Sequence, residues 1–78
     1  MQKKIKVGEI LRWHTKFVQK YVVVHIDYQN EEEIKVVVVG LSTGHILGPY
    51  WYKKKCFVSE GMMPKLKFNL VYKDKIKE

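Results

Sequence analysis

A chain of 78 residues that is 46% apolar has room for one hydrophobic core and is too apolar to remain disordered, despite its net charge of +7. Its longest apolar stretch, residues 36–41, is about a third of a membrane-spanning length, and no signal-peptide h-region follows the basic start. We therefore expect one cytoplasmic domain, and the single cysteine excludes an intramolecular disulfide.

The first half of the chain predicts three strands. Residues 9–14 form the first, and a loop over residues 15–19 follows. Residues 20–28 are rich in β-branched and aromatic side chains, as are residues 34–41. The polar segment between them, residues 29–33, contains an asparagine suited to a turn. The second and third strands are therefore predicted to form an antiparallel hairpin.

The second half is more interrupted. Two glycines and a proline in residues 42–49 predict a loop without a long regular element. The apolar clusters at residues 50–52 and 56–58, separated by three lysines, predict a short strand or a single 3₁₀ turn. Residues 59–64 are predicted to form another loop.

Residues 65–72 alternate between apolar and polar side chains, which predicts a closing strand. Its apolar face would carry Leu66, Phe68, Leu70 and Tyr72. Residues 73–78 are predicted to form a frayed tail. No helical spacing of apolar residues persists for three turns, so the predicted fold is all-β: a five-stranded antiparallel small barrel that occupies residues 1–78 as one domain, with its core over about residues 5–72.

This order of elements resembles an SH3-like barrel of the kind found in KOW and Tudor domains. The features that carry the resemblance are residues 8–11 opening the first strand, the central hairpin, the glycine-rich stretch before an aromatic residue, and a short turn before the last strand. It extends over roughly residues 5–72 and concerns architecture. No binding residue is carried over from either family.

The predicted hairpin is apolar on both faces. If Val22, Val24, Ile26 and Tyr28 face inward with Val36 and Val38, alternation places Tyr21, Val23, His25, Val37 and Val39 outside. One interpretation is that residues 1–7 or the C-terminal tail cover this outer face. The other is that it is an interface for a partner or for a second copy in a homodimer.

The densest functional signal is the basic aromatic segment Tyr50, Trp51, Tyr52, Lys53, Lys54 and Lys55. Aromatic rings can stack on bases, and lysines can neutralise phosphates. Arg12, His14, Lys16 and Lys20 are predicted to extend this surface from the loop after the first strand. Alternatively, some of the rings fill the core, the segment binds an acidic protein surface, or it holds a small anionic ligand.

The sequence offers no constellation for catalysis or for metal binding. His14, His25 and His45 lack the close spacing of metal ligands. Cys56, beside Phe57, is predicted to be a buried thiol, and the three consecutive glutamates at residues 31–33 suit a solvated turn. We therefore expect no enzyme activity, no metal and no cofactor.

The function predicted from the sequence is a non-catalytic module that binds DNA or RNA through the basic aromatic surface, with no membrane partner. The alternative is a small adaptor or inhibitor, of the kind used as accessory proteins by viruses or mobile elements, that docks or dimerises through the valine-rich hairpin.

Overall fold

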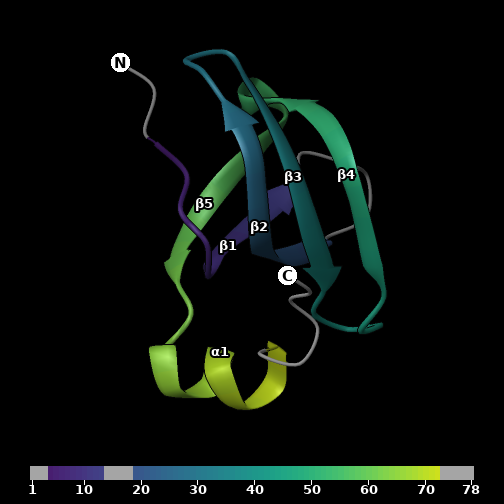
Figure 1. Cartoon of the computed structure of the whole chain (residues 1–78), viewed down its shortest axis with the longest axis vertical. Coiled ribbons are helices and arrows are strands. Elements are labelled where there is room, and N and C mark those ends of the chain that lie inside the picture. The colour runs from purple at the N-terminus through teal and green to yellow at the C-terminus, as the bar shows by residue number, and fades with distance from the viewer. Residues whose placement is uncertain (1–3, 14–18, 73–78) are drawn as a thin grey trace.

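The computed structural model describes residues 4–13 and 19–72, which contain five strands, one 3₁₀ turn and one helix (Figure 1). In chain order the elements are β1 (Glu9–Trp13), β2 (Lys20–Gln29), β3 (Glu33–Gly40), β4 (Ile46–Lys53), η1 (Lys54–Cys56), β5 (Phe57–Met62) and α1 (Lys65–Tyr72). All strand pairs are antiparallel, and the sheet order is β4-β3-β2-β1-β5. The predicted all-β class is confirmed. The sheet is not closed, so the barrel is only approximate.

The β2–β3 hairpin forms where the sequence predicts it. Asn30 at the turn accepts two backbone hydrogen bonds at its Oδ1, from the N–H of Glu32 at 2.8 Å and of Glu33 at 2.7 Å. Its own N–H donates to the carbonyl of Glu33 at 2.9 Å. The short amide side chain thus fixes the backbone of the acidic segment, as expected of asparagine in a turn.

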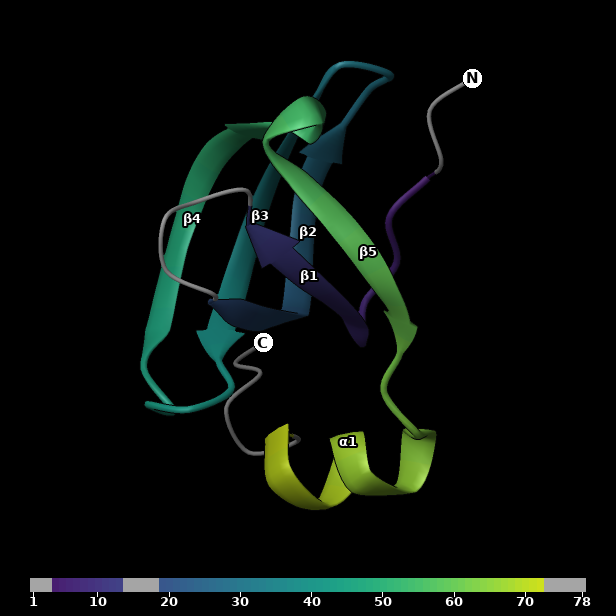
Figure 2. The ribbon, with the colours of Figure 1, turned by 180° about the vertical axis from the view of Figure 1, so that it is seen from behind.

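Two irregularities bend β2. Val23 pairs with Val38 and His25 pairs with Val37, so Val24 is an extra residue in the ladder. A second shift lies between Ile26 and Tyr28. Such bulges bend and twist a strand. As a result, β1 and β5 cross over the long strands of the same sheet rather than lying flat beside them (Figure 2).

The main core lies on the concave side of this bent sheet. It contains Ile5, Leu11, Val23, Ile34, Val36, Val38 and Phe57, all nearly inaccessible to solvent. Trp13 at the end of β1 contacts three aromatic rings, with centroid distances of 4.9 Å to Tyr52, 5.0 Å to Phe57 and 5.2 Å to Tyr21. Because β1 and β4 share no ladder, the contact between Trp13 and Tyr52 joins the two parts of the sheet through side chains.

The predicted closing strand at residues 65–72 is wrong, because this segment is α1. The place beside β1 is already taken by β5, which the sequence analysis had divided between a short apolar cluster and a loop. The helix begins after Pro64, whose carbonyl accepts the N–H of Phe68 at 2.9 Å. Of the supposed apolar face, Phe68 is buried, whereas Leu66 and Leu70 are exposed.

A second apolar cluster lies on the opposite, outer face of the sheet, beneath α1. Val22, Val24 and Val39 are buried there against Met63 and Phe68. The predicted faces of β2 are therefore wrong at several positions. Val23 points into the main core rather than outward, while Tyr28 is exposed rather than inward.

The predicted loop over residues 42–49 is wrong in its second half, because β4 begins at Ile46. Val36 pairs with Tyr50 and Val38 pairs with Leu47, so residues 48–49 form a bulge in β4. Gly48 has a positive φ of 114°, and a Cβ at this position would lie 2.5 Å from the carbonyl oxygen of Val36. Only glycine fits this close approach of β4 to β3.

Candidate nucleic-acid interface

An exposed aromatic row crosses the outer face at the end of the sheet that α1 does not cover. Tyr28 on β2 pairs with Lys35 on β3, which pairs with Trp51 on β4. Tyr28 and Trp51 are 54% and 52% exposed. Their ring centroids lie 5.7 Å apart at 61°, and the Nζ of Lys35 lies 6.0 Å from the Trp51 ring. We call Tyr28, Lys35 and Trp51 the aromatic row.

The structure divides the three predicted aromatics of β4 between the two faces of the sheet. Tyr50 and Tyr52 pair with the inward residues Val36 and Ile34, so alternation places Trp51 alone on the outer face. Tyr52 packs against the main core, and burial raises the pKa of its phenol. Tyr50 is 55% exposed at the rim of the concave side. Trp51 is thus the one member of the trio within reach of Tyr28.

The three predicted lysines also have separate environments. Lys54, in η1, is only 7% exposed, and its Nζ donates a 2.9 Å hydrogen bond to the Oε1 of Gln29. Burial lowers the pKa of Lys54, although the nearby carboxylates of Glu31 and Glu9 act in the opposite direction. Lys54 therefore belongs to the internal structure, and only Lys53 and Lys55 are exposed.

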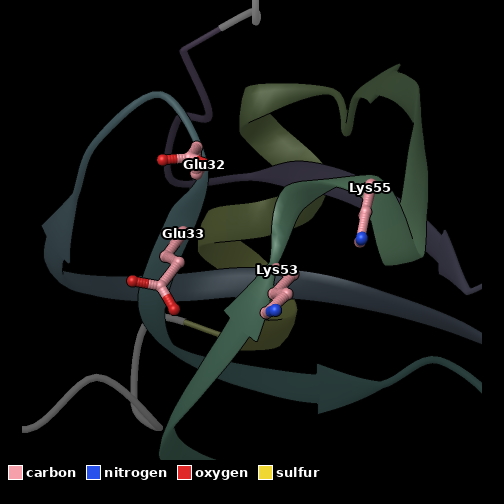
Figure 3. Close-up of a pocket in the computed structure, with 4 residues that line it drawn as sticks. All are labelled: Glu32, Glu33, Lys53 and Lys55. Carbon is pink, nitrogen blue, oxygen red and sulfur yellow. The ribbon is translucent and has the colours of Figure 1, made fainter.

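A cavity of about 390 Å³ lies next to the aromatic row and is lined by Glu32, Glu33, Lys53 and Lys55 (Figure 3). The carboxylates come from the β2–β3 turn and the start of β3, and the ammonium groups come from the end of β4 and from η1. The N–H of Lys54 donates to the carbonyl of Glu32 at 2.8 Å, which ties the two walls together. Within the described part of the chain, none of these four side chains forms an ion pair. We call this site the mixed-charge cavity.

The predicted cations of the first strand do not join this surface. Glu60 on β5 forms ion pairs with Arg12 and with Lys20, each at 2.9 Å. The hydrogen bond from Lys20 is the main reason that the pKa of Glu60 is lowered. Lys20 begins β2, whereas Lys54 contacts Gln29 at the other end of that strand. His14 and Lys16 lie outside the described residues.

The predicted valine interface is mostly internal. Val23 and Val39 are fully buried within the chain, Val37 is half-buried under α1, and Tyr21 is half-buried against Trp13. His25 is exposed, as predicted, and its Nε2 lies 2.7 Å from the Oδ1 of Asp27. The expectation of an exposed valine patch is therefore wrong. The outer face is covered in part by residues 63–68, which belong to neither of the terminal segments, residues 1–7 and the C-terminal tail, that the alternative names.

Sequence reasoning missed several residues that the fold brings together. The sequence pattern predicts Tyr28 in the core, and it marks Lys35, Glu32 and Glu33 for no site. The alternation of Lys35 with Ile34 and Val36 was a usable signal, because it places Lys35 opposite the core. The pairing of Lys35 with Trp51 depends on the register between β3 and β4, which cannot be read from the sequence alone.

The remaining reactive or titratable groups among the described residues are not part of the aromatic row or the mixed-charge cavity. Glu9 is 1% exposed, and its Oε1 accepts the N–H of Lys6 at 3.0 Å. Cys56 is exposed, so its predicted burial is wrong. No group of three or more His, Cys, Asp or Glu side chains in residues 4–13 and 19–72 could hold a metal ion. In that same part of the chain no helix has the length and apolarity to cross a membrane.

Comparison with protein-family models, curated proteins and solved structures finds no match to this chain.

Proposed function

We propose that this chain is a non-catalytic module that binds single-stranded nucleic acid on the outer face of its sheet, with the aromatic row as the contact surface. The observation that carries this proposal is the pair of half-exposed rings, Tyr28 and Trp51, on a sheet surface that no described element covers. Stacking of bases on such rings contributes about 1–3 kcal/mol per base and needs no particular base.

The distribution of charge supports the same surface. The chain carries a net charge of +7, which favours association with polyanions. Lys35 lies within the aromatic row, and Lys53 and Lys55 are exposed beside it. The phosphates of a strand whose bases stack on Tyr28 and Trp51 would therefore contact these ammonium groups, which form no ion pair among the described residues.

We also propose that the scaffold is an SH3-like small barrel. Its support is the sheet order β4-β3-β2-β1-β5, in which four strands follow one another as a meander and the last returns to pair with the first. The packing of Trp13 on Tyr52 completes the interior by side chains, although the ladder itself stays open.

The test of nucleic-acid binding is a fluorescence titration of labelled single-stranded oligonucleotides at two salt concentrations. We expect Trp51→Ala to weaken binding about tenfold, because it removes one stacking ring. Tyr50→Ala is the matched control. Tyr50 is the adjacent residue and is equally exposed, but it lies on the other face, so its loss should leave the affinity within about twofold of wild type.

The salt dependence gives a second reading from the same titration. Each neutralised phosphate should add about 0.7 to the magnitude of the log–log salt slope for a single strand. Absence of binding at low salt contradicts the proposal. An equal loss in Trp51→Ala and Tyr50→Ala contradicts the assignment to the outer face.

A second candidate function is self-association through α1. Leu66 and Leu70 are 73% and 78% exposed, and they lie four residues apart on one side of the helix. Sedimentation over a range of concentrations tests this candidate. A dimer that Leu70→Glu dissociates supports it, and a concentration-independent monomer excludes it.

A further inference from the structure

The mixed-charge cavity continues the aromatic row on the same face of the sheet. Glu33 precedes Lys35 by two residues on β3, and Lys53 follows Trp51 by two residues on β4. Residues two apart on a strand share a face, and Glu33 pairs with Lys53 in the ladder. A strand of nucleic acid on the aromatic row would therefore extend over the cavity.

Carboxylates in the path of a polyanion are unfavourable unless the ligand offers them hydrogen-bond donors. The backbone N–H groups of Glu32 and Glu33 donate to the Oδ1 of Asn30, which fixes the backbone that carries both carboxylates. Neither side chain is neutralised by an ion pair within the described residues. Each nucleotide of RNA carries a 2′-hydroxyl, which is a donor close to its phosphate, and DNA lacks it. Acidic side chains recognise ribose hydroxyls in other nucleotide sites.

The opposite wall of the cavity supplies the complementary group. Lys53 and Lys55 line the other side of the cavity from the two glutamates, as Figure 3 shows, and they form no ion pair among the described residues. A volume of about 390 Å³ falls within the range of small-molecule sites, which is roughly 300–1,000 Å³. One wall thus suits a phosphate and the other suits a hydroxyl donor, and a ribonucleotide presents both.

We infer that the mixed-charge cavity is a ribonucleotide subsite, in which Glu33 accepts the 2′-hydroxyl while Lys53 and Lys55 hold the adjoining phosphate, so that the chain prefers single-stranded RNA to DNA. This inference rests on the proposed function and adds the class of nucleic acid. The base itself is read only by stacking on Trp51, so the preference concerns the sugar rather than the sequence.

The test compares three labelled oligonucleotides of equal length and identical bases: oligouridine, oligodeoxyuridine and 2′-O-methyl oligouridine. We expect oligouridine to bind about tenfold more tightly than oligodeoxyuridine, since one hydrogen bond to a charged acceptor is of this order. The 2′-O-methyl form should bind like the deoxy form, because it keeps the oxygen but has lost the donor.

Variants assign the preference to the cavity. Glu33→Ala removes the acceptor and should reduce the ratio of RNA to DNA affinity towards one. The double variant E32A/E33A removes both acceptors of this wall and should abolish the preference. Glu31→Ala is the matched control. It removes the same charge from the same turn, but Glu31 does not line this cavity, so affinity for both oligonucleotides should rise equally and the ratio should persist.

The outcomes separate the two proposals. Equal binding of oligouridine and oligodeoxyuridine by wild type overturns the ribonucleotide subsite and leaves the binding module intact. A preference that survives E32A/E33A also overturns it. Absence of binding to all three oligonucleotides at low salt overturns the module and the subsite together.

Discussion

The two ends of the outer sheet face are built from the same strands but have opposite character. At the end under α1, β2 and β3 contribute Val22, Val24 and Val39, and all three are buried. At the other end, the same two strands contribute Tyr28 and Lys35, which remain in contact with solvent. β-branched side chains suit a covered face, whereas rings and lysine stems can shield backbone while keeping polar atoms in water. The covered end stabilises the fold, and the open end is free to bind.

The largest expected effect lies at the covered end. Phe68→Ala should lower the free energy of unfolding by about 3 kcal/mol, because Phe68 is the buried ring that seals the valine cluster. Urea unfolding followed by circular dichroism measures this loss. Leu66→Ala, two residues earlier but exposed, should change stability by less than about 0.5 kcal/mol. Equal losses in both variants would mean that α1 does not seal the face as described.

A smaller effect on the free energy of unfolding is expected at Lys54, which is buried near the open end. Lys54→Met should stabilise the protein by about 1 kcal/mol at neutral pH, because it removes a buried charge and keeps the volume of the side chain. Gln29 Oε1 still accepts the N–H of Ile5 after the change. Lys53→Met, at an exposed neighbour, should have little effect on unfolding and serves as the control.

The gain from Lys54→Met should depend on pH. Burial lowers the pKa of Lys54 below the ordinary value of 10.5 that applies to the unfolded chain. Between these two pKa values the unfolded state binds more protons, so wild-type stability gains from rising pH and the advantage of the variant shrinks. Unfolding at pH 7 and at pH 10 measures the difference. An equal advantage of Lys54→Met at both pH values would contradict a lowered pKa of Lys54. A variant less stable than wild type at pH 7 would mean that the Lys54–Gln29 hydrogen bond stabilises the fold by more than the burial of the charge costs.

The next effect tests the open end by charge. Lys35→Met keeps the stem beside Trp51 but removes the ammonium group, so the salt slope for a single strand should fall by about 0.7 and affinity at low salt by about threefold. Lys65→Met, on α1, is the control at the covered end, and it should leave the slope unchanged. A loss of slope in the control would show that phosphates also contact the covered end.

The smallest effect is expected at Glu60. Glu60→Gln releases Arg12 and Lys20 from their ion pairs, yet Lys20 lies at the other end of β2 from Gln29 and Lys54, so the salt slope should not change. The same release occurs as pH falls through the lowered pKa of Glu60, where the carboxylate gains a proton and its contribution to stability is lost. A steeper slope in Glu60→Gln would extend the interface to the first strand.

The local parts of the fold were predictable, and the parts that depend on register were not. The period-two patterns of β1 and of the β2–β3 hairpin each indicate a strand without reference to the rest of the chain. The extra residue at Val24 reverses the faces of β2, and such a slip becomes visible only when the partner strand is known. Residues 65–72 alternate like a strand, but they form α1, and the strand that pairs with β1 is β5.

The candidate site shows the same division. Trp51 belongs to a basic aromatic segment that the sequence marks clearly, and it remains a member of the candidate site. Lys54 and Tyr52 look equivalent to their neighbours in the sequence. In the fold, Lys54 is turned away from the surface by its hydrogen bond to Gln29, and Tyr52 by its contact with the Trp13 ring. Tyr28 lies near Trp51 because both pair with Lys35 on β3, and Glu33 lies near Lys53 because the two pair directly. Contacts between distant residues therefore decide which side chains act together.

The bulge at residues 48–49 has a consequence for the behaviour of this chain at high concentration. The four consecutive valines of β3 are a sequence of the kind that assembles into fibrils when its backbone is accessible. β4 covers one side of them and is itself the outermost strand. Because Pro49 has no N–H and Gly48 displaces the ladder, the free side of β4 offers an incoming chain only short, interrupted stretches for pairing. An irregular strand thus shields an aggregation-prone neighbour from intermolecular growth.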